Sequence, residues 1–199
     1  MSPYGVPRFT LCRRAAEEVG YPFGTGLQLS LLWGTRWGET TSCQRTFIDP
    51  KERLIILPDT KNGTEHCFPY GDRTAAILET IPRYNSAELL FPGKHGQPWN
   101  GAGKAKWELK ERCKIAPWQI LDLRRTFATK IAELKDENGR TAVQPHIVER
   151  LINHKVGTLQ AQGVITAVAE VYNRYMYLDE MRDAVRRWED KLTIILQRP

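Results

Sequence analysis

Residues 121–126 read LDLRRT, and residues 171–174, further along the chain, read VYNR. The first stretch places two arginines just after a carboxylate, and the second places an arginine two residues after a tyrosine. Guanidinium groups bind a phosphate bidentately and stabilise the negative charge that develops on it during nucleophilic attack. A tyrosine hydroxyl can take over such a phosphate covalently. Together the two stretches indicate chemistry on a phosphodiester.

The size and charge of the chain are those of one soluble domain. Its 199 residues are 41% hydrophobic and 26% charged, which is normal for a globular protein and argues against disorder. Lysine and arginine outnumber aspartate and glutamate by 29 to 23, and the net charge of +6 suits a polyanionic partner. No apolar stretch approaches the ~20 residues of a membrane span, so we expect a cytoplasmic protein without a membrane partner. The scattered cysteines lack zinc-ligand spacing and are expected to be unpaired thiols: Cys12, Cys43, Cys67 and Cys113.

The hydrophobic pattern predicts a mostly helical α+β fold with a small sheet inserted early. Three β-rich segments, with a strong hairpin signal at residues 61–63, predict a three-stranded antiparallel sheet; they cover residues 45–48, 53–57 and 65–70. Helices are predicted over residues 9–19, 28–41, 72–81, 103–113, 124–134, 144–152, 166–176 and 178–195. The last helix carries an apolar stripe on one face, formed by Met181, Ala184, Val185, Trp188 and Leu192.

Each candidate site residue also has an ordinary structural interpretation. Arg36 follows an apolar segment, and it could simply pair with Glu39 or with helix carbonyls. Lys61, in the hairpin turn, could be a solvated lysine, although a hairpin lysine is also a plausible proton donor to a leaving oxygen. His154 could be a helix cap or a surface residue, and Tyr172 could be one of several core tyrosines. Taken singly, each of these residues leaves both interpretations open.

The adjacent arginines of the first stretch carry a sharper expectation. Neighbouring residues cannot share a face of a helix. We therefore expect one of Arg124 and Arg125 to point at a site and the other to face solvent or a partner. Asp122 just before them suits the positive end of a helix dipole.

Six phrases in a fixed order decide between these interpretations. They read LLWGTRWGE (31–39), TKNG (60–63), LLFP (89–92), DLRRTFAT (122–129), LINH (151–154) and VYNRYMYLDE (171–180). In this order they resemble the catalytic domain of the tyrosine recombinases, the phage integrase family. The resemblance runs from about residue 25 to the end of the chain, and its arginine and tyrosine phrases are the most specific.

The resemblance implies a catalytic role for five residues. Arg36 and Arg124 would clamp the non-bridging oxygens of the scissile phosphate, and His154 would hydrogen-bond that phosphate. Lys61 would protonate the leaving 5′-oxygen, and Tyr172 would be the nucleophile that forms a 3′-phosphotyrosine. Neither a metal nor any other cofactor is implied.

The resemblance also implies a domain organisation and partners. It predicts one catalytic domain over residues 1–199, with a lead-in helix and linker at 1–24, a C-terminal helix at 178–199, and no N-terminal DNA-gripping domain. The expected partner is the double-stranded DNA of an attachment site, on which the full-length protein forms a homotetramer, whereas an isolated domain is expected to be a monomer. In the family the C-terminal segment often docks on a neighbouring protomer. Docking of the apolar stripe on its own domain and on a neighbour both remain open.

One residue departs from the family pattern. The family has a histidine three residues before the second arginine, where this chain has Leu121. Leucine cannot accept a proton or hydrogen-bond a phosphate, so we expect slowed chemistry.

The resemblance as a whole predicts a site-specific DNA recombinase of a phage or genomic island. The alternatives are a catalytically impaired DNA-binding remnant and, less favoured, a related relaxing topoisomerase.

Overall fold

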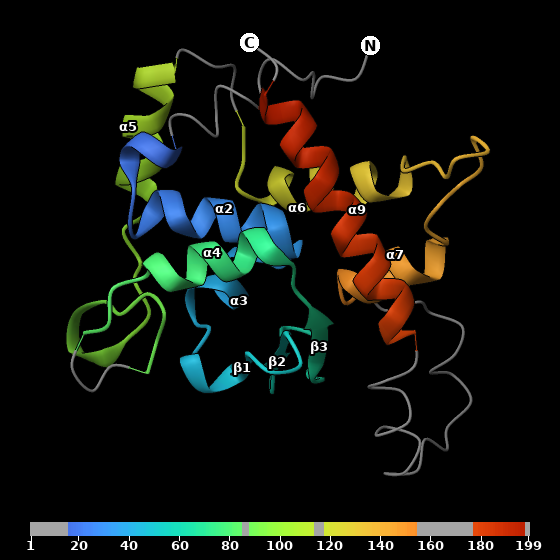
Figure 1. Ribbon diagram of the computed structural model, residues 1–199. Helices are drawn as coiled ribbons and strands as arrows, with labels where there is room; N and C mark the ends of the chain where they lie inside the picture. Colours follow the sequence, from blue (N-terminus) through green and yellow to red (C-terminus); the bar gives the residue numbers. More distant parts are fainter. Residues whose placement is uncertain (1–15, 85–87, 114–117, 155–176, 198–199) are drawn as a thin grey trace.

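Helix α2 (Phe23–Trp33) runs through the middle of the molecule and contacts α3 (Trp37–Thr41), α4 (Asp72–Thr80) and α6 (Leu121–Ala132) (Figure 1). The computed structural model describes residues 16–84, 88–113, 118–154 and 177–197. Most of α2 is buried, because other elements pack on several of its sides. Helix α2 is therefore the support on which the site-bearing elements rest.

The sheet is small and antiparallel, as predicted. Strands β1 (Ile48–Asp49), β2 (Leu54–Leu57) and β3 (His66–Pro69) lie in the order β1-β2-β3, with Ile55 opposite Phe68. The first strand is shorter than expected, because Arg45–Phe47 form a 3-10 turn. The connection between β2 and β3 is the predicted hairpin.

The remaining helices match the sequence pattern closely. Helix α5 spans Ala102–Cys113, α7 spans Pro145–Leu151, and a short 3-10 turn spans Lys94–Gly96. Helix α6 begins three residues earlier than predicted, so Asp122 lies in its first turn. Residues 16–19 are helical, but the rest of the helix expected at 9–19 and the whole helix expected at 166–176 lie outside the described residues. None of the described helices is long and apolar enough to cross a membrane.

The single helix predicted over residues 28–41 is wrong. Helix α2 ends at Gly34, whose φ of 65° is left-handed, and α3 begins only after the extended residue Arg36. A side chain at position 34 would also collide with Phe127, since a Cβ there would lie 2.2 Å from its ring. Gly34 thus breaks the helix and lets α6 approach, and Arg36 precedes a helix instead of ending one.

In this single chain, helix α9 (Leu178–Gln197) packs on its own domain through its apolar stripe. All five stripe residues are buried in the main core with α2, the sheet, α6 and α7. Trp188 stacks edge-on against Phe127 at 5.9 Å, and its indole N–H donates to the Leu31 carbonyl at 3.3 Å. From α9, Glu189 also reaches the start of α4, where its carboxylate accepts the Arg73 backbone N–H at 2.9 Å.

Candidate active site

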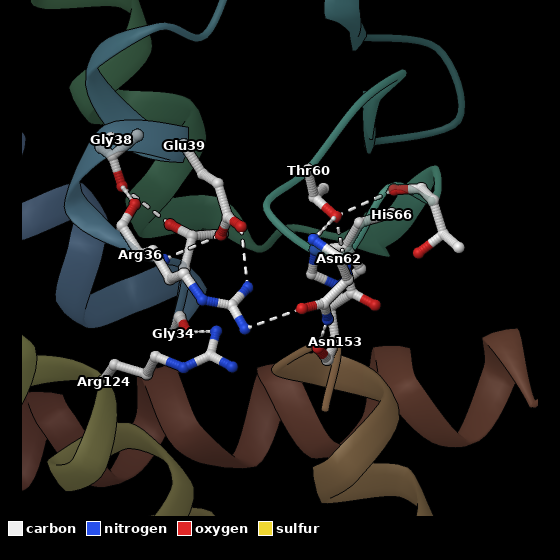
Figure 2. A network of polar contacts seen from close by, with 12 residues as sticks. Gly34, Arg36, Gly38, Glu39, Thr60, Asn62, His66, Arg124 and Asn153 are labelled. Atoms are coloured by element: carbon white, nitrogen blue, oxygen red, sulfur yellow. Dashed lines mark hydrogen bonds and ion pairs between the residues drawn. The ribbon is translucent and has the colours of Figure 1, made fainter. Parts of the chain in front are cut away.

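The innermost residue of the candidate site is Arg124, on the buried face of α6. Arg124, Phe127 and Ile131 recur at helical spacing and are the buried residues of this helix. The Arg124 side chain is only 8% exposed, and its Nη1 donates to the Gly34 carbonyl at 2.9 Å. The break after α2 therefore supplies both the space for α6 and an acceptor that orients the guanidinium group (Figure 2).

Arg36 is held in the break between α2 and α3 by Glu39. One Glu39 oxygen accepts the Arg36 backbone N–H at 2.9 Å, and the other accepts its Nη1 at 2.8 Å. The pairing with Glu39 considered from the sequence is thus confirmed. It leaves the rest of the guanidinium group directed toward Arg124 and the hairpin, and Nη2 lies 3.3 Å from Asn62 Oδ1 (Figure 2).

Arg36 and Arg124 concentrate positive charge beside the hairpin, and the Arg124 side chain is largely removed from water. Burial and, second, the charge of Arg36 lower the pKa of Arg124 from 12.5 to about 10, while Glu39 and Glu149 oppose the shift. Arg124 therefore stays protonated at neutral pH. Among the residues that the structure describes, no carboxylate forms an ion pair with it. A buried cation without a counter-charge is costly, so an anionic ligand beside Arg124 would be stabilising.

A hollow of about 460 Å³ lies between α9 and the start of α4 and is also rich in arginine. Its cations differ from Arg124 because carboxylates already neutralise several of them. The pairs are Arg53 with Asp72, Arg182 with Glu52, and Arg186 with Asp190. Arg124, which no carboxylate neutralises in the described part of the chain, is therefore the stronger candidate for an anion site.

The hairpin between β2 and β3 brings Lys61 to this region. The Gly63 N–H donates to the Thr60 carbonyl at 2.8 Å, which closes a turn with Lys61 at its first corner. Lys61 is exposed and forms no ion pair within the described ranges. Its neighbour Asn62 contacts Arg36, so the backbone that carries Lys61 is held beside the arginine pair.

The C-terminal end of α7 approaches from the other side and carries His154. The chain leaves the helix through Asn153, whose φ is +48°, and the Asn153 carbonyl accepts the Asn62 amide at 2.7 Å. The His154 ring is 61% exposed, and its Nδ1 lies 2.5 Å from a Glu149 oxygen. The structure thus gathers Arg36, Arg124 and the segments that carry Lys61 and His154.

A second histidine, His66, is buried beneath these residues on β3. Its Nε2 donates to the Arg150 carbonyl at 3.2 Å, and its ring packs against Phe68 at 4.6 Å between centroids. Burial, assisted by the charges of Arg124 and Arg36, lowers the pKa of His66 from 6.5 to about 3. His66 is therefore a neutral structural group and not a proton carrier near pH 7.

Of the remaining residues singled out from the sequence, the structure describes Arg125 and Leu121 but not Tyr172. Arg125 is 60% exposed and pairs with Asp122 at 2.9 Å, which confirms that only one of the adjacent arginines points inward. Leu121, the first residue of α6, is 45% exposed. Tyr172 lies outside the described residues, so the proposed nucleophile has no position here.

Sequence patterns assigned no role to Asn62, His66 or Asn153, although all three join the site segments. Asparagine is common in turns and at positive φ, so residue type alone could have predicted that Asn62 and Asn153 lie in turns. Their contacts join positions 84 to 93 residues apart, and no local pattern announces such pairs. Among the described residues, no group of three or more His, Cys, Asp or Glu side chains is arranged to hold a metal ion.

Comparison with known proteins identifies the fold. No family model and no curated protein matches the sequence. Among solved structures, the lambda integrase catalytic core matches with a TM-score of 0.58 and 15% identity, over 78% of this chain and 96% of that one. XerA recombinase matches with 0.59 and 16%, over 87% and 62%, and the integrase from mycobacterium phage Brujita with 0.63 and 17%, over 94% and 58%.

The mostly helical architecture with its early three-stranded sheet is thus the catalytic fold of the tyrosine recombinases. The chain spans nearly all of the lambda catalytic core but only about 60% of the length of the other two proteins. At 15–17% identity these similarities establish the fold alone. The activity has to be argued from the residues of the site.

Proposed function

We propose that this chain is the catalytic domain of a site-specific DNA recombinase that cuts and rejoins strands through a 3′-phosphotyrosine, in integration or excision of a mobile element. The observation that carries the proposal is Arg124, a buried guanidinium without a carboxylate partner among the described residues, beside Arg36. A phosphodiester supplies the missing negative charge, and its non-bridging oxygens fit the donors of two guanidinium groups.

The proposed reaction assigns one step to each group. Arg36 and Arg124 hold the non-bridging oxygens and stabilise the charge that develops during attack. The Tyr172 hydroxyl gives its proton to water as its oxygen bonds to phosphorus, the bond to the 5′-oxygen breaks, and Lys61 gives that oxygen a proton. His154 donates a hydrogen bond to the phosphate. A 5′-hydroxyl of a second strand then attacks the phosphotyrosine, restoring the phosphodiester and the free tyrosine.

The proposed partner is duplex DNA, on which several copies assemble. Lambda integrase has been solved as a dimer bound to a COC′ core site and as a tetramer bound to a Holliday junction. We propose the same mode of action for this chain, because the arrangement of its arginine pair is made for a phosphate. DNA binding should weaken as salt rises, since lysine and arginine contacts to phosphates release counterions.

Covalent capture from a pool of random DNA tests this proposal. The chain is incubated with nicked duplexes of randomised sequence, denatured with SDS, and any DNA that stays attached is sequenced. We expect a covalent adduct with an enriched sequence, which disappears in Tyr172→Phe and persists in Tyr177→Phe. Loss of the adduct in Tyr177→Phe instead would overturn the assignment of the nucleophile.

A second candidate function is supported by Leu121, because the side chain at the first residue of α6 cannot take up or release a proton. It is a DNA-binding remnant that no longer cuts. Salt-sensitive DNA binding without any adduct would favour this candidate. Relaxation of supercoiled plasmid without site preference would favour a topoisomerase.

A further inference from the structure

The side chain of Asn62 connects three segments that are distant in sequence. Its Oδ1 accepts from Arg36 Nη2 at 3.3 Å, and its Nδ2 donates to the Asn153 carbonyl at 2.7 Å. One amide therefore bridges the turn before α3, the tip of the hairpin and the end of α7 (Figure 2). An amide can make both bonds because its oxygen is an acceptor and its nitrogen a donor.

The Asn153 side chain makes a second contact between the end of α7 and the hairpin. Its Nδ2 donates to Thr60 Oγ1 at 3.0 Å, and that hydroxyl donates to the Thr64 carbonyl across the hairpin at 2.9 Å. Its φ of +48° lies in the left-handed region, which asparagine tolerates better than most side chains do. The conformation that ends α7 thus aims the Asn153 amide at the base of the Lys61 turn.

A third contact lies below these two, where His66 donates to the Arg150 carbonyl at 3.2 Å. We call these residues the hairpin–α7 seam: Thr60, Asn62, His66, Arg150 and Asn153. The seam fastens the hairpin to α7 on either side of the turn that presents Lys61. Each hydrogen bond of this kind contributes modestly to stability, which is enough to order a loop and too little to decide the fold.

Lys61 needs such a fastening. It lies exposed at the corner of a turn and forms no ion pair in the described part of the chain. A general acid must come within hydrogen-bond reach of the atom that it protonates, and a misplacement of 1 Å can cost ~10²-fold in rate. Hairpin tips are also among the first parts of a protein to open.

We propose that Asn62 and Asn153 are positioning residues that lock the Lys61 hairpin to the end of α7 and to Arg36, so that the proton donor and the arginine pair form one unit. This inference rests on the proposed function for the role of Lys61. The lock itself is a property of the free protein and can be tested without any reaction.

Hydrogen exchange tests the lock directly. Asn153→Gly keeps the left-handed backbone and the carbonyl that Asn62 uses, and removes only the amide that reaches Thr60. Asn62→Ala removes both contacts of the bridging amide. Asn138→Ala is the matched control, because Asn138 is an exposed loop asparagine that uses only its backbone N–H.

We expect faster exchange of the backbone amides at residues 61–64 in Asn62→Ala and Asn153→Gly, with exchange in β2 unchanged and no effect of Asn138→Ala. Unchanged exchange at residues 61–64 in both seam variants would overturn the lock. Acceleration throughout the sheet would overturn it as well, because the two asparagines would then act on overall stability and not on the hairpin.

Cleavage of two substrates tests the link to Lys61. In one duplex the scissile phosphate is ordinary, and in the other a sulfur replaces its 5′-bridging oxygen, so that the thiolate leaves without a proton. We expect Asn62→Ala to cut the ordinary duplex about 10–100-fold more slowly and the sulfur duplex nearly as fast as the parent chain. Equal losses on both duplexes would overturn the role in positioning Lys61.

Asn62→Asp separates the two bonds of the bridging amide, because a carboxylate still accepts from Arg36 and cannot donate to Asn153. We expect it to behave like Asn62→Ala on the ordinary duplex. Parental rates on both duplexes would overturn the proposal. If the parent chain forms no adduct at all, the proposed function fails, and the exchange experiment alone decides whether the lock exists.

Discussion

The two halves of the candidate site are held in place by different kinds of interaction. The arginine half rests on the hydrophobic core, since Arg124 shares a helix face with Phe127 and is oriented by the Gly34 carbonyl. The seam half rests on two partly buried side-chain amides, Asn62 and Asn153. Changes in the first half should therefore alter stability and activity together or in opposite directions. Changes in these two amides should alter activity while the fold remains intact.

The strongest test of this contrast replaces the buried cation by an apolar side chain of similar length. Arg124→Met should lower the rate of adduct formation by about 10³ or more, because a donor to the charge developing in the transition state is lost. Its free energy of unfolding should stay level or rise, since an unpaired buried charge has gone. Urea unfolding and adduct kinetics measure the two effects.

Arg125→Met provides the control for that substitution, because the neighbouring side chain is exposed and paired only with Asp122. It should leave adduct formation within a few-fold of the parent chain. An equal loss of activity in both variants would contradict the assignment of Arg124 as the inward arginine.

The second test adds a group to the arginine half. Leu121→His restores a proton-handling side chain at the first residue of α6, where 45% exposure leaves room for an imidazole. General acid–base assistance is worth roughly 10²–10⁴, so cleavage of a nicked duplex should accelerate within that range. An unchanged rate would show that position 121 does not limit this chain.

The third test disturbs the core beneath the arginine half. Gly34→Ala forces a side chain into a left-handed residue and against Phe127, and should destabilise the chain by about 2–4 kcal/mol in denaturant unfolding. Gly38→Ala is the matched control, because no atom lies within 4 Å of a Cβ placed at that helical position. It should be neutral or stabilise the chain by up to about 1 kcal/mol. Equal effects of the two substitutions would contradict the role of Gly34.

The fourth and smallest effect concerns the base of the seam and depends on pH. Because the folded-state pKa of His66 is about 3 and its ordinary value is 6.5, the unfolded chain binds more protons between those values. Stability should therefore be fully present above pH 6.5 and fall with acidification by up to about 1.4 kcal/mol per pH unit. His66→Gln should flatten the slope measured between pH 5 and 6.5. An unchanged slope would show that His66 is not buried in its neutral form.

Much of the fold followed from patterns within single segments. The turn at residues 61–63 predicted the hairpin, and the stripe from Met181 to Leu192 predicted the buried face of α9. The error at residues 28–41 has a physical cause, because apolar periodicity continues through Gly34 while the backbone does not. What stops the helix there is a left-handed glycine facing Phe127, which lies 93 residues further along the chain.

The candidate site was predictable to a similar extent. The order of its phrases predicted Arg36 and Arg124 as a pair, and the structure brings them together beside the hairpin and the end of α7. The amides of Asn62 and Asn153 were not predicted, because a hydrogen bond between distant turns leaves no periodicity in sequence. The role of Tyr172 stays a prediction from the resemblance.

The docking of α9 decides which of its sides is presented to solvent. Its apolar side is already satisfied within the same molecule, and its outer side carries linked charges such as Asp183, Arg186 and Arg187. In the described residues this side of α9 is dominated by ion-paired charges, with Ile194 as an exposed apolar side chain near its end. Any contact made through those charges would weaken as salt screens them.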